Sequence, residues 1–532
     1  MYDYVIVGAG SAGCVLAARL TEDPRTTVLL LEAGGQDDAD EVRIPLAFSK
    51  LFKTRHDWAY TTTSQKYAHG RSLYWPRGRV LGGSSSINAM IYIRGNRLDY
   101  DSWRDDFGCA GWGYADLLPY FLRSEDQARG ASAYHGTGGP LRVEDPRDLH
   151  RLSRSFVDAA VSWGLPRCDD FNGAEQEGAG AYQLTQRGGR RWSAADGYLR
   201  PALERPNLTA HTDALATRVV VEHGRAVGVA YRRGGLDRIA RVDAEVVLCG
   251  GAVNSPQVLL LSGIGPAGQL REHAIDVVVD LPGVGANLQD HPVVPVIWLT
   301  HGVRRDLNDY ALRDLLRWKA THRGLLTSNV AESGAFLRSF PALPAPDVQF
   351  HVAPAAFLDH GLSEPIGQGF SIGPTLVSVA SRGRLTLRSA DPRWAPAIDP
   401  GYLGERADVD ALAQGIEMAR EIATHQPITR YLASEHLPGP EVSTVDELRE
   451  YVRGNIETLY HPVSTCAMGN DEESVVDTEL RVRGVEGLRV VDSSVMPAAP
   501  RGNTNAPTIA IAERAADLLR GQLPLAPAVP SR

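Results

Sequence analysis

Residues 4–13 read YVIVGAGSAG, a short apolar run that ends in a GxGxxG pattern. Apolar residues then recur at helical spacing as far as Leu20, and a second apolar run, Val28–Leu31, ends at Glu32. Strand, glycine turn, helix and second strand are the order of a βαβ dinucleotide-binding unit, whose turn brings backbone close to a pyrophosphate at the helix N-terminus. Glu32 is placed to accept hydrogen bonds from a ribose and would repel a 2′-phosphate. The unit alone indicates either NAD or FAD.

The composition is typical of a globular enzyme. Of the 532 residues 43% are hydrophobic and 22% are charged, and at roughly 150 residues per domain the length predicts two to four lobes. The net charge of −9 argues against nucleic acid or an anionic membrane surface as a partner. One basic-aromatic cluster stands out and is interpreted as a solvated loop or a structural ion pair: Arg187, Arg190, Arg191 and Trp192.

The cysteines and the chain start bear on location. Five cysteines are scattered, odd in number and never in a CxxC pair, so we expect neither a disulfide framework nor a metal site. The chain begins directly with its first strand, which leaves no room for a signal peptide, and it has no run of about 18 apolar residues. We therefore expect a cytoplasmic protein without an integral membrane span.

Further elements follow along the chain. Alternating apolar residues predict strands within 216–229, and a buried strand is expected at 245–249. Ser255-Pro256 predicts the start of a helix, with serine as cap and proline at its first position. A second lobe is expected from about residue 298 to 455, with a helix at 408–422. A strand at 488–492 and a closing helix at 508–519 complete the chain.

Several of these segments resemble the glucose–methanol–choline (GMC) flavin oxidoreductases. The two longest are GRVLGGSSSIN at 78–88 and GAVNSPQVLLLSGIG at 251–265. Shorter ones are PGVGANLQDH at 282–291, YHP at 460–462 and NTNAPT at 503–508. The resemblance implies an α/β fold in which a Rossmann-like FAD-binding domain carries a mixed α+β substrate-binding domain over the flavin. The FAD-binding domain is then expected at 1–150, 201–297 and 456–532, a substrate-side insertion at 151–200 and the substrate-binding domain at 298–455.

The resemblance also implies which residues hold the cofactor. The glycine turn is expected at the pyrophosphate, Glu32 at the adenosine ribose, backbone near Val219 at the adenine, and the 79–91 stretch at the flavin. A helix that starts at 505–508 beneath the flavin would stabilise the negative charge of its reduced form. The full expected set is Gly8, Gly10, Ser11, Ala12, Gly13, Glu32, Ala33, Trp58, Arg79, Val80, Gly83, Ser84, Asn88, Ala89, Met90, Ile91, Val219, Asp492, Ser493, Asn505 and Thr508.

One departure from the family pattern concerns attachment of the cofactor. Some relatives bind FAD covalently through a histidine immediately before the residue aligned with Asn88. This chain has Ile87 there, which cannot form such a bond. We therefore expect non-covalent FAD.

The same resemblance implies two catalytic residues. His461 is expected to remove the hydroxyl proton while the alcohol carbon delivers hydride to the flavin, a task that suits an unperturbed pKa of about 6.5. Counting back from Ala512 places Asn503, rather than Asn505, at the partner position that hydrogen-bonds the substrate oxygen.

The substrate is expected to be a small primary alcohol, choline-like, aryl or aliphatic. Glu332 resembles the carboxylate that choline-type enzymes keep near their substrate, and the alternative is an ion pair with an arginine at the lobe interface. Trp58 or Phe357 would offer cation–π contact, and His360 is a further candidate for the pocket wall.

Other activities of the same fold stay open at this point. A hydroxynitrile-type lyase and a flavin photodecarboxylase share its motifs, and either oxygen or another acceptor would reoxidise the flavin. No oligomeric state is assigned.

Overall fold

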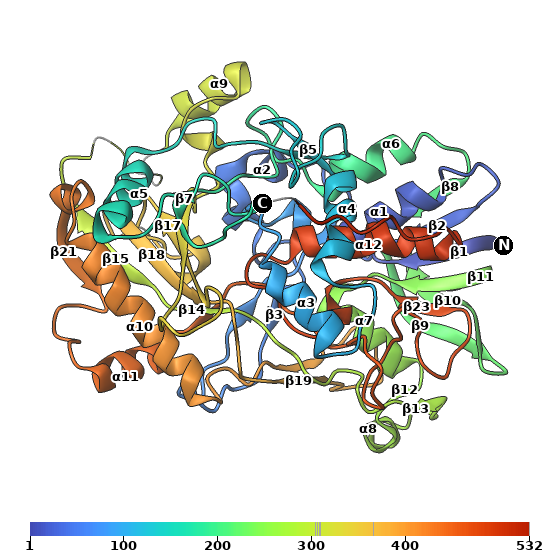
Figure 1. The fold of residues 1–532 in the computed structure, drawn as a ribbon. Coiled ribbons are helices and arrows are strands. Elements are labelled where there is room, and N and C mark those ends of the chain that lie inside the picture. The colour runs from blue at the N-terminus through green and yellow to red at the C-terminus, as the bar shows by residue number, and fades with distance from the viewer. Residues whose placement is uncertain (304, 306, 308–309, 365, 531–532) are drawn as a thin grey trace.

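The computed structural model describes residues 1–303, 305, 307, 310–364 and 366–530, and arranges them around two β-sheets at opposite ends of the molecule (Figure 1). The chain crosses between the two sheets several times. The expected α/β class, with a Rossmann-like part and a mixed second part, is confirmed.

The first sheet is built from the predicted dinucleotide unit. β1 (Tyr2–Val7) lies between β2 (Val28–Leu31) and β11 (Leu236–Leu248), parallel to both. All four residues of β2 are buried, as expected for strands covered on both faces. The remaining strands are β8 (Leu208–His211) beside β2, β23 (Leu488–Val490) beside β11, and the antiparallel β10 (Arg225–Arg233) and β9 (Ala214–Glu222).

Helices cover this sheet where its glycine turn ends. α1 (Ser11–Leu20) follows the turn directly, α12 (Asn505–Leu519) packs against α1, and α4 (Tyr114–Ser124) packs against α12. The fully buried Glu513 carboxylate joins the three helices through Arg19 at 2.9 Å and Arg123 at 2.8 Å. α12, the closing helix, begins at Asn505, three residues before its predicted start.

The start predicted at Ser255-Pro256 for another helix, α7, is wrong. α7 runs over Gly251–Leu261, so Pro256 lies inside it instead of at its first turn. A proline at this position cannot donate to the Ala252 carbonyl four residues earlier. Thr465 Oγ1 donates to that carbonyl at 2.8 Å instead, so a residue from a distant segment makes the internal proline tolerable.

The second sheet carries the substrate-side elements. Its strands are, in order, β21 (Leu432–Leu437), β15 (Val296–Thr300), β18 (Gly369–Leu376), β17 (Val348–Ala353), β16 (Ser333–Leu337) and β7 (Gly178–Ala181), and β14 (Pro292–Val293) pairs with both β18 and β22 (Glu457–Thr458). α10 (Arg406–Ala423) and α5 (Arg151–Trp163) pack on it, and α11 (Val445–Asn455) packs on α10. The domain limits expected from the resemblance (1–150, 151–200, 201–297, 298–455 and 456–532) stay a prediction. The strands of this second sheet come from 178–181 and from 292–458.

Shorter elements connect these parts. They are α2 (Asp40–Arg43), η1 (Pro45–Leu51), β3 (Tyr60–Thr61), β4 (Tyr74–Trp75), η2 (Gly83–Ser86), α3 (Arg97–Asp105), β5 (Glu125–Gln127), β6 (Leu141–Val143), η3 (Ala195–Leu199), α6 (Arg200–Ala202), β12 (Ile264–Gly265), α8 (Ala267–Glu272), β13 (Val279–Asp280), α9 (Leu312–Thr321), η4 (Leu325–Thr327), η5 (Asp359–Gly361), β19 (Arg384–Thr386), β20 (Ala397–Asp399), η6 (Ile428–Tyr431) and η7 (Ser493–Val495).

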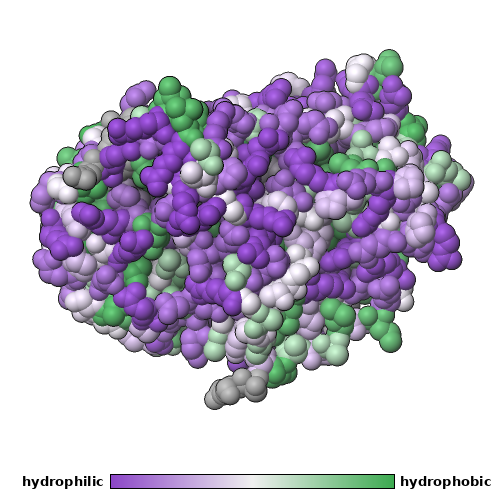
Figure 2. Space-filling view, turned by 90° about the horizontal axis from the view of Figure 1, so that it is seen from above, coloured by the Kyte–Doolittle hydropathy of each residue, from purple (hydrophilic) through white to green (hydrophobic). Residues whose placement is uncertain are grey.

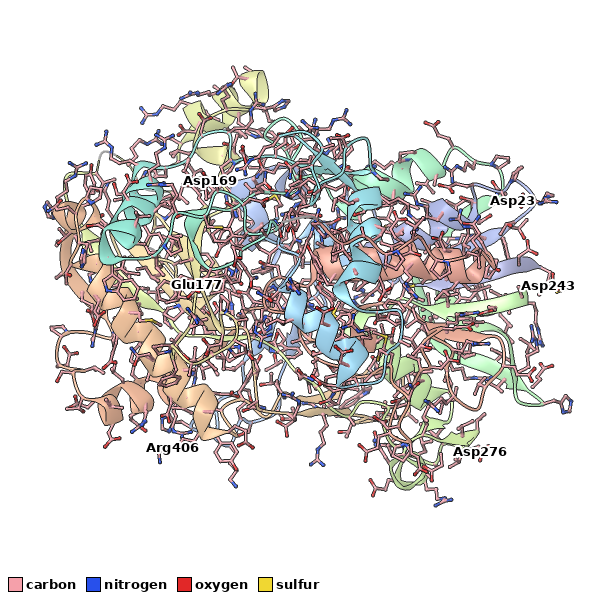
Figure 3. All side chains as sticks on the ribbon, viewed as in Figure 1. Asp23, Asp169, Glu177, Asp243, Asp276 and Arg406 are labelled. Atoms are coloured by element: carbon pink, nitrogen blue, oxygen red, sulfur yellow. The ribbon has the colours of Figure 1, made fainter. Side chains whose placement is uncertain are left out.

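The outer surface is largely hydrophilic. The face in Figure 2 shows apolar residues only in small, separate groups. Charged side chains such as Asp243, Asp276 and Arg406 lie at the periphery (Figure 3). Within the described part of the chain, no helix has both the length and the apolar composition to cross a bilayer.

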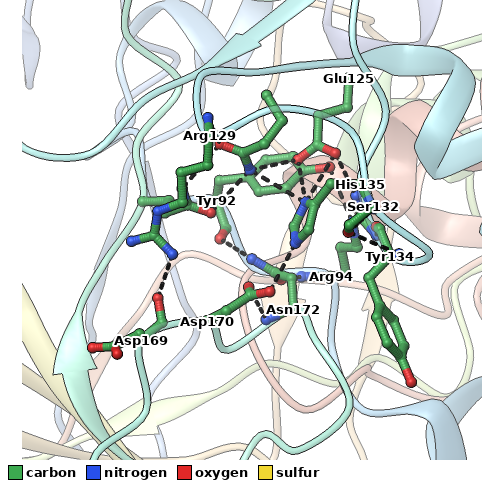
Figure 4. A network of polar contacts seen from close by, with 12 residues as sticks. Tyr92, Arg94, Glu125, Arg129, Ser132, Tyr134, His135, Asp169, Asp170 and Asn172 are labelled. Atoms are coloured by element: carbon green, nitrogen blue, oxygen red, sulfur yellow. Dashed lines mark hydrogen bonds and ion pairs between the residues drawn. The ribbon is translucent and has the colours of Figure 1, made fainter. Parts of the chain in front are cut away.

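A buried polar network fixes the chain just after the 78–91 loop (Figure 4). Arg94 donates to Glu125 at 2.8 Å, and His135 bridges Glu125 at 3.0 Å and Asp170 at 2.8 Å. Burial opposes the charge of His135, but its hydrogen bonds to Asp170 and Glu125 raise the pKa of the imidazole. Asn172 completes the network through the Arg94 amide. Paired in this way, the charges are retained in the interior.

Candidate active site

One elongated cavity extends from the glycine turn of β1 to the loop that carries His461. It passes the 83–91 loop, the start of α7 and the inner side of the second sheet. Most expected cofactor residues line it: Gly8, Gly10, Ser11, Ala12, Glu32, Ala33, Trp58, Gly83, Ser84, Asn88, Ala89, Met90, Ile91, Asp492, Ser493, Asn505 and Thr508. Segments almost 500 residues apart therefore form one continuous wall.

The glycines at one end are required by close backbone contacts. A Cβ on Gly8, where φ is +101°, would lie 2.5 Å from the Cys249 carbonyl oxygen. A Cβ on Gly83 would lie 2.6 Å from the Cα of Gly10, so the two loops press against each other with no room for a side chain. Gly13 does not line the cavity; its Cβ would lie 1.9 Å from the Gly8 oxygen, and its role is close packing of α1 on the turn.

The Glu32 carboxylate links the glycine turn to the loop that follows β2. Its Oε2 accepts a hydrogen bond from the Ala9 amide and its Oε1 one from the Gly34 amide, both at 2.8 Å. The side chain is buried, and burial raises the pKa of Glu32 to about 7. Its carboxylate has acceptor capacity beyond these two bonds, as a ribose hydroxyl requires.

The N-terminus of α12 meets the same turn. Ser11 Oγ donates to Asn505 Oδ1 at 2.6 Å, which ties the start of α1 to the start of α12. Asp492 accepts from the Gly251 amide at 2.8 Å and from Ser255 Oγ at 2.6 Å, which ties the end of β23 to α7. The N-termini of α1, α7 and α12 thus line the cavity, where their partial positive charge favours an anionic group such as a pyrophosphate. The residues present therefore fit a dinucleotide.

At the other end of the cavity, His461 is held between two polar partners. Its Nε2 lies 3.1 Å from Asn503 Nδ2, and its Nδ1 lies 3.0 Å from Nδ1 of His291. Gln349 Nε2 donates to Asn503 Oδ1 at 3.4 Å, so the amide of Asn503 is oriented as well. The structure brings Asn503, and not Asn505, to His461.

The hydrogen bonds assign the tautomers of the two histidines. Asn503 Nδ2 donates, so His461 Nε2 is an acceptor and the ring proton sits on Nδ1, from which it is donated to His291 Nδ1. His291 then carries its proton on Nε2, which has no partner among the described residues, at a cost of about 1–3 kcal/mol. Burial, followed by the nearby His291 and His351, lowers the pKa of His461 well below 6.5, and burial lowers the pKa of His291 to about 3. At neutral pH His461 therefore presents an unprotonated Nε2 to the cavity.

The backbone before His461 is unusual and well supported. Tyr460 has a φ of +70°, a conformation that a bulky residue adopts only when its surroundings impose it. The His461 amide donates to Asp290 Oδ1 at 2.6 Å, and Thr458 Oγ1 donates to Oδ2 of the same carboxylate at 2.5 Å. Arg77 donates to the Tyr460 carbonyl at 2.7 Å. These bonds hold the strained turn that directs the imidazole into the cavity.

The wall beside His461 is mainly apolar. Phe48 lies 5.7 Å from Phe52 and 6.4 Å from Phe357 between ring centroids, and Phe52 lies 6.0 Å from Tyr460. Glu457 is the carboxylate that lines this part, and burial raises its pKa to about 7. The ring cluster therefore offers an apolar surface with one carboxyl group whose neutral form is favoured by burial.

Several predicted residues do not line the cavity. Glu332 accepts hydrogen bonds from the His150 amide and from Ser153 Oγ, both at 2.7 Å, and is 1% exposed, so its partners are neither a substrate cation nor an arginine. His360 lies behind Tyr460, with Nδ1 2.5 Å from the tyrosine hydroxyl.

The remaining residues off the cavity wall support it from behind. The Val219 amide donates to Ser262 Oγ at 2.8 Å, and the cavity wall in that region is formed by 214–216. Arg79 stacks on the Trp58 ring at 4.9 Å, and Val80 is fully buried. A strand pattern shows that a segment pairs but not which of its residues reaches a ligand, and the role expected of Val219 at the adenine stays a prediction.

Sequence reasoning missed three polar side chains of the site. His291 lies in the 282–291 stretch that resembles the family, and this was the available signal, although no role was assigned to it. His351 lines the cavity from β17, and Asp290 carries the turn at His461. No local pattern around His351 distinguishes it from a residue of an ordinary strand.

The fold and the site define a protein that binds a dinucleotide against a Rossmann-like sheet, in a cavity that a second sheet closes. Residues 2–293 and 379–512 match the family described as GMC oxidoreductase. The chain belongs to this family, and its cofactor is FAD.

Known relatives span nearly the whole chain. An alcohol dehydrogenase [acceptor] of Pseudomonas putida is 45% identical over 98% of this chain and 96% of its own length. The human mitochondrial choline dehydrogenase is 44% identical over 98% of this chain and 90% of its own length. The crystal structure of pyridoxine 4-oxidase from Mesorbium loti has a TM-score of 0.91 at 33% identity and covers 98% of this chain and 100% of its own.

Proposed function

We propose that the protein oxidises a primary alcohol to an aldehyde, with His461 as the base and Asn503 as its hydrogen-bonding partner. The carrying observation is the pair of His461 Nε2 and Asn503 Nδ2, 3.1 Å apart, in the cavity that begins at the dinucleotide turn. FAD, held by the glycine turn, Glu32 and the 83–91 loop, would supply the acceptor for the hydride that leaves the alcohol carbon. The alcohol and choline dehydrogenases among the relatives support oxidation and do not favour the lyase or photodecarboxylase alternatives.

The residues at this site suit their proposed tasks. An alcohol oxygen between the imidazole and the amide would donate its proton to His461 Nε2 and accept a hydrogen bond from Asn503 Nδ2. Asn503 then stabilises the negative charge that develops on oxygen. His291, which accepts from His461 Nδ1, keeps the imidazole in the tautomer that can receive the proton.

For the substrate we propose an uncharged primary alcohol with an aliphatic or aryl chain rather than choline. Phe48, Phe52 and Phe357 supply apolar contact surface. Burial raises the pKa of Glu457 to about 7, and Glu332 is engaged with backbone and serine elsewhere. Binding choline would bury both its cation and the Glu457 carboxylate, and an uncharged alcohol avoids this desolvation penalty.

An alcohol panel with anaerobic bleaching of the flavin tests this function. Medium-chain and aryl primary alcohols are expected to bleach it, with choline roughly 100-fold or more less efficient because burying its cation beside Glu457 carries a desolvation penalty. Parallel assays for peroxide and for reduction of an artificial dye distinguish oxygen from another acceptor. If no alcohol bleaches the flavin and a cyanohydrin is cleaved, oxidation is wrong; if choline is the best substrate, the apolar assignment is wrong.

The cytoplasmic location stays a prediction.

The pH dependence follows from the pKa of His461. Because burial lowers this pKa below 6.5, the base stays unprotonated down to pH values under its ordinary range. With a neutral alcohol, kcat/KM is expected to be level from pH 7 down through pH 6.5 and to fall about tenfold per unit only at pH values well below 6.5. Steady-state kinetics with an apolar alcohol measure this profile. An acidic limb centred above pH 7 would contradict the unprotonated, buried imidazole.

A further inference from the structure

Arg191 is a buried cation that forms no ion pair with a carboxylate of the described residues. It is 4% exposed, and its Nε donates to the Val42 carbonyl at 2.8 Å. Its Nη1 donates to the Ser85 carbonyl at 3.1 Å and to Asn88 Oδ1 at 2.7 Å, while its buried Nη2 has no partner. Among the described residues no carboxylate forms an ion pair with it. The sequence interpretation of this cluster as a solvated loop or an ion pair is therefore wrong for Arg191.

The charge of Arg191 is not cancelled nearby. All three of its acceptors are neutral oxygens, and Asp196, which acts on it from a distance, is paired with Arg200 at 3.0 Å. Burial lowers the pKa of Arg191, but an arginine keeps its proton at neutral pH. A buried cation of this kind is costly unless something negative comes near it.

The contact to Asn88 leads directly into the cavity. Asn88 Oδ1 accepts from both Arg191 and the Met90 amide, the latter at 3.0 Å, so its Nδ2 is turned to the cavity that Asn88 lines. Met90 has a φ of +60°, and the Thr185 amide holds its carbonyl at 2.8 Å. Arg191 therefore fixes a strained loop of the cavity wall and sets the orientation of one of its amides.

We propose that Arg191 is a positioning residue for the flavin: it orients Asn88 and its uncancelled positive charge favours electron uptake by FAD. This rests on the proposed function and on the 83–91 loop lying at the flavin, as the family resemblance implies. A positive charge within about 10 Å lowers the energy of an anionic ring by an amount that corresponds to a change of roughly tenfold in an equilibrium constant.

Three variants of the FAD-containing enzyme test the proposal. Arg191→Gln keeps a donor for Asn88 and removes the charge, Arg191→Lys keeps the charge, and Arg187→Gln removes an exposed charge from the same hairpin. The readouts are the dissociation constant for sulfite, which leaves the oxidised flavin negatively charged, and the reduction potential against reference dyes. We expect Arg191→Gln to weaken sulfite binding roughly tenfold and lower the potential. Arg191→Lys and Arg187→Gln should stay within about threefold of the wild type.

Wild-type sulfite affinity and potential in Arg191→Gln overturn the proposal, as does an equal loss in Arg191→Gln and Arg191→Lys, which would show a packing role alone. If Arg191→Gln does not retain FAD, Arg191→Met takes its place. Wild-type readouts in Arg191→Met, or a loss equal to that in Arg191→Lys, then overturn the proposal. These readouts need no alcohol, so failure of alcohol oxidation would leave them intact and is recognised separately.

Discussion

Replacing His461 by alanine is expected to lower kcat for an apolar alcohol by ~10²-fold or more while FAD stays bound. The imidazole presents an unprotonated nitrogen to the cavity, 3.1 Å from Asn503 Nδ2. Its removal leaves the alcohol proton without an acceptor at that point. The glycine turn and the 83–91 loop are untouched, so the flavin spectrum and content should match the wild type. Single-turnover reduction of the flavin measures the effect on the chemical step.

Two further variants make this result specific. His436 is an exposed histidine, and His436→Ala should leave the rate unchanged. Asn503→Ala should lower kcat by roughly 10- to 100-fold, since one hydrogen bond to a developing charge is lost. A His461→Ala enzyme that reduces its flavin within threefold of the wild-type rate would remove His461 from its proposed role.

The second large effect is expected at the contact between Gly83 and Gly10. Gly83→Ala adds a methyl group 2.6 Å from the Cα of Gly10, at a residue whose φ of +54° already disfavours a side chain. Because both loops line the cavity, relieving the clash changes its shape. At about 1–3 kcal/mol for overpacking, FAD should bind roughly 10- to 100-fold more weakly. Titration of the apoprotein with FAD measures this loss.

A glycine on the surface provides the control. Gly268 lies on α8, and a Cβ built there meets no atom within 4 Å. Gly268→Ala should keep full FAD content and unfold at the wild-type temperature or slightly above it, because alanine favours a helix over glycine. If Gly83→Ala binds FAD as tightly as Gly268→Ala, the packed contact between the two loops is not required for the cofactor.

Local sequence predicted most of the first sheet correctly. β1, α1 and β2 are contiguous, and their apolar period decides both their type and their burial. The start of α7 was predicted wrongly because Pro256 is a strong local signal for a helix start. Its cost is offset by Thr465, about 200 residues away, which no local pattern contains.

The candidate site divides in the same way. His461, Asn503 and the glycine turn were predictable because each sits in a short stretch that resembles the family. The partners that set their chemistry come from distant segments, as with His291 for the tautomer and Arg191 for the orientation of Asn88. Glu332 shows the converse, since a plausible local motif supplied a substrate carboxylate that the fold places against His150 and Ser153.

By itself, the sequence determined the class of fold, the cofactor and the two residues proposed for catalysis. The class of fold follows from contiguous stretches whose spacing dictates their local structure, and the cofactor and the two residues follow from contiguous stretches that resemble the family's motifs. Only the tertiary structure decided which nitrogen of His461 is free, which wall the substrate meets and where an uncancelled charge lies. Those properties depend on burial and on hydrogen bonds between residues from different segments of the chain, and both exist only once the two sheets have come together around the cavity.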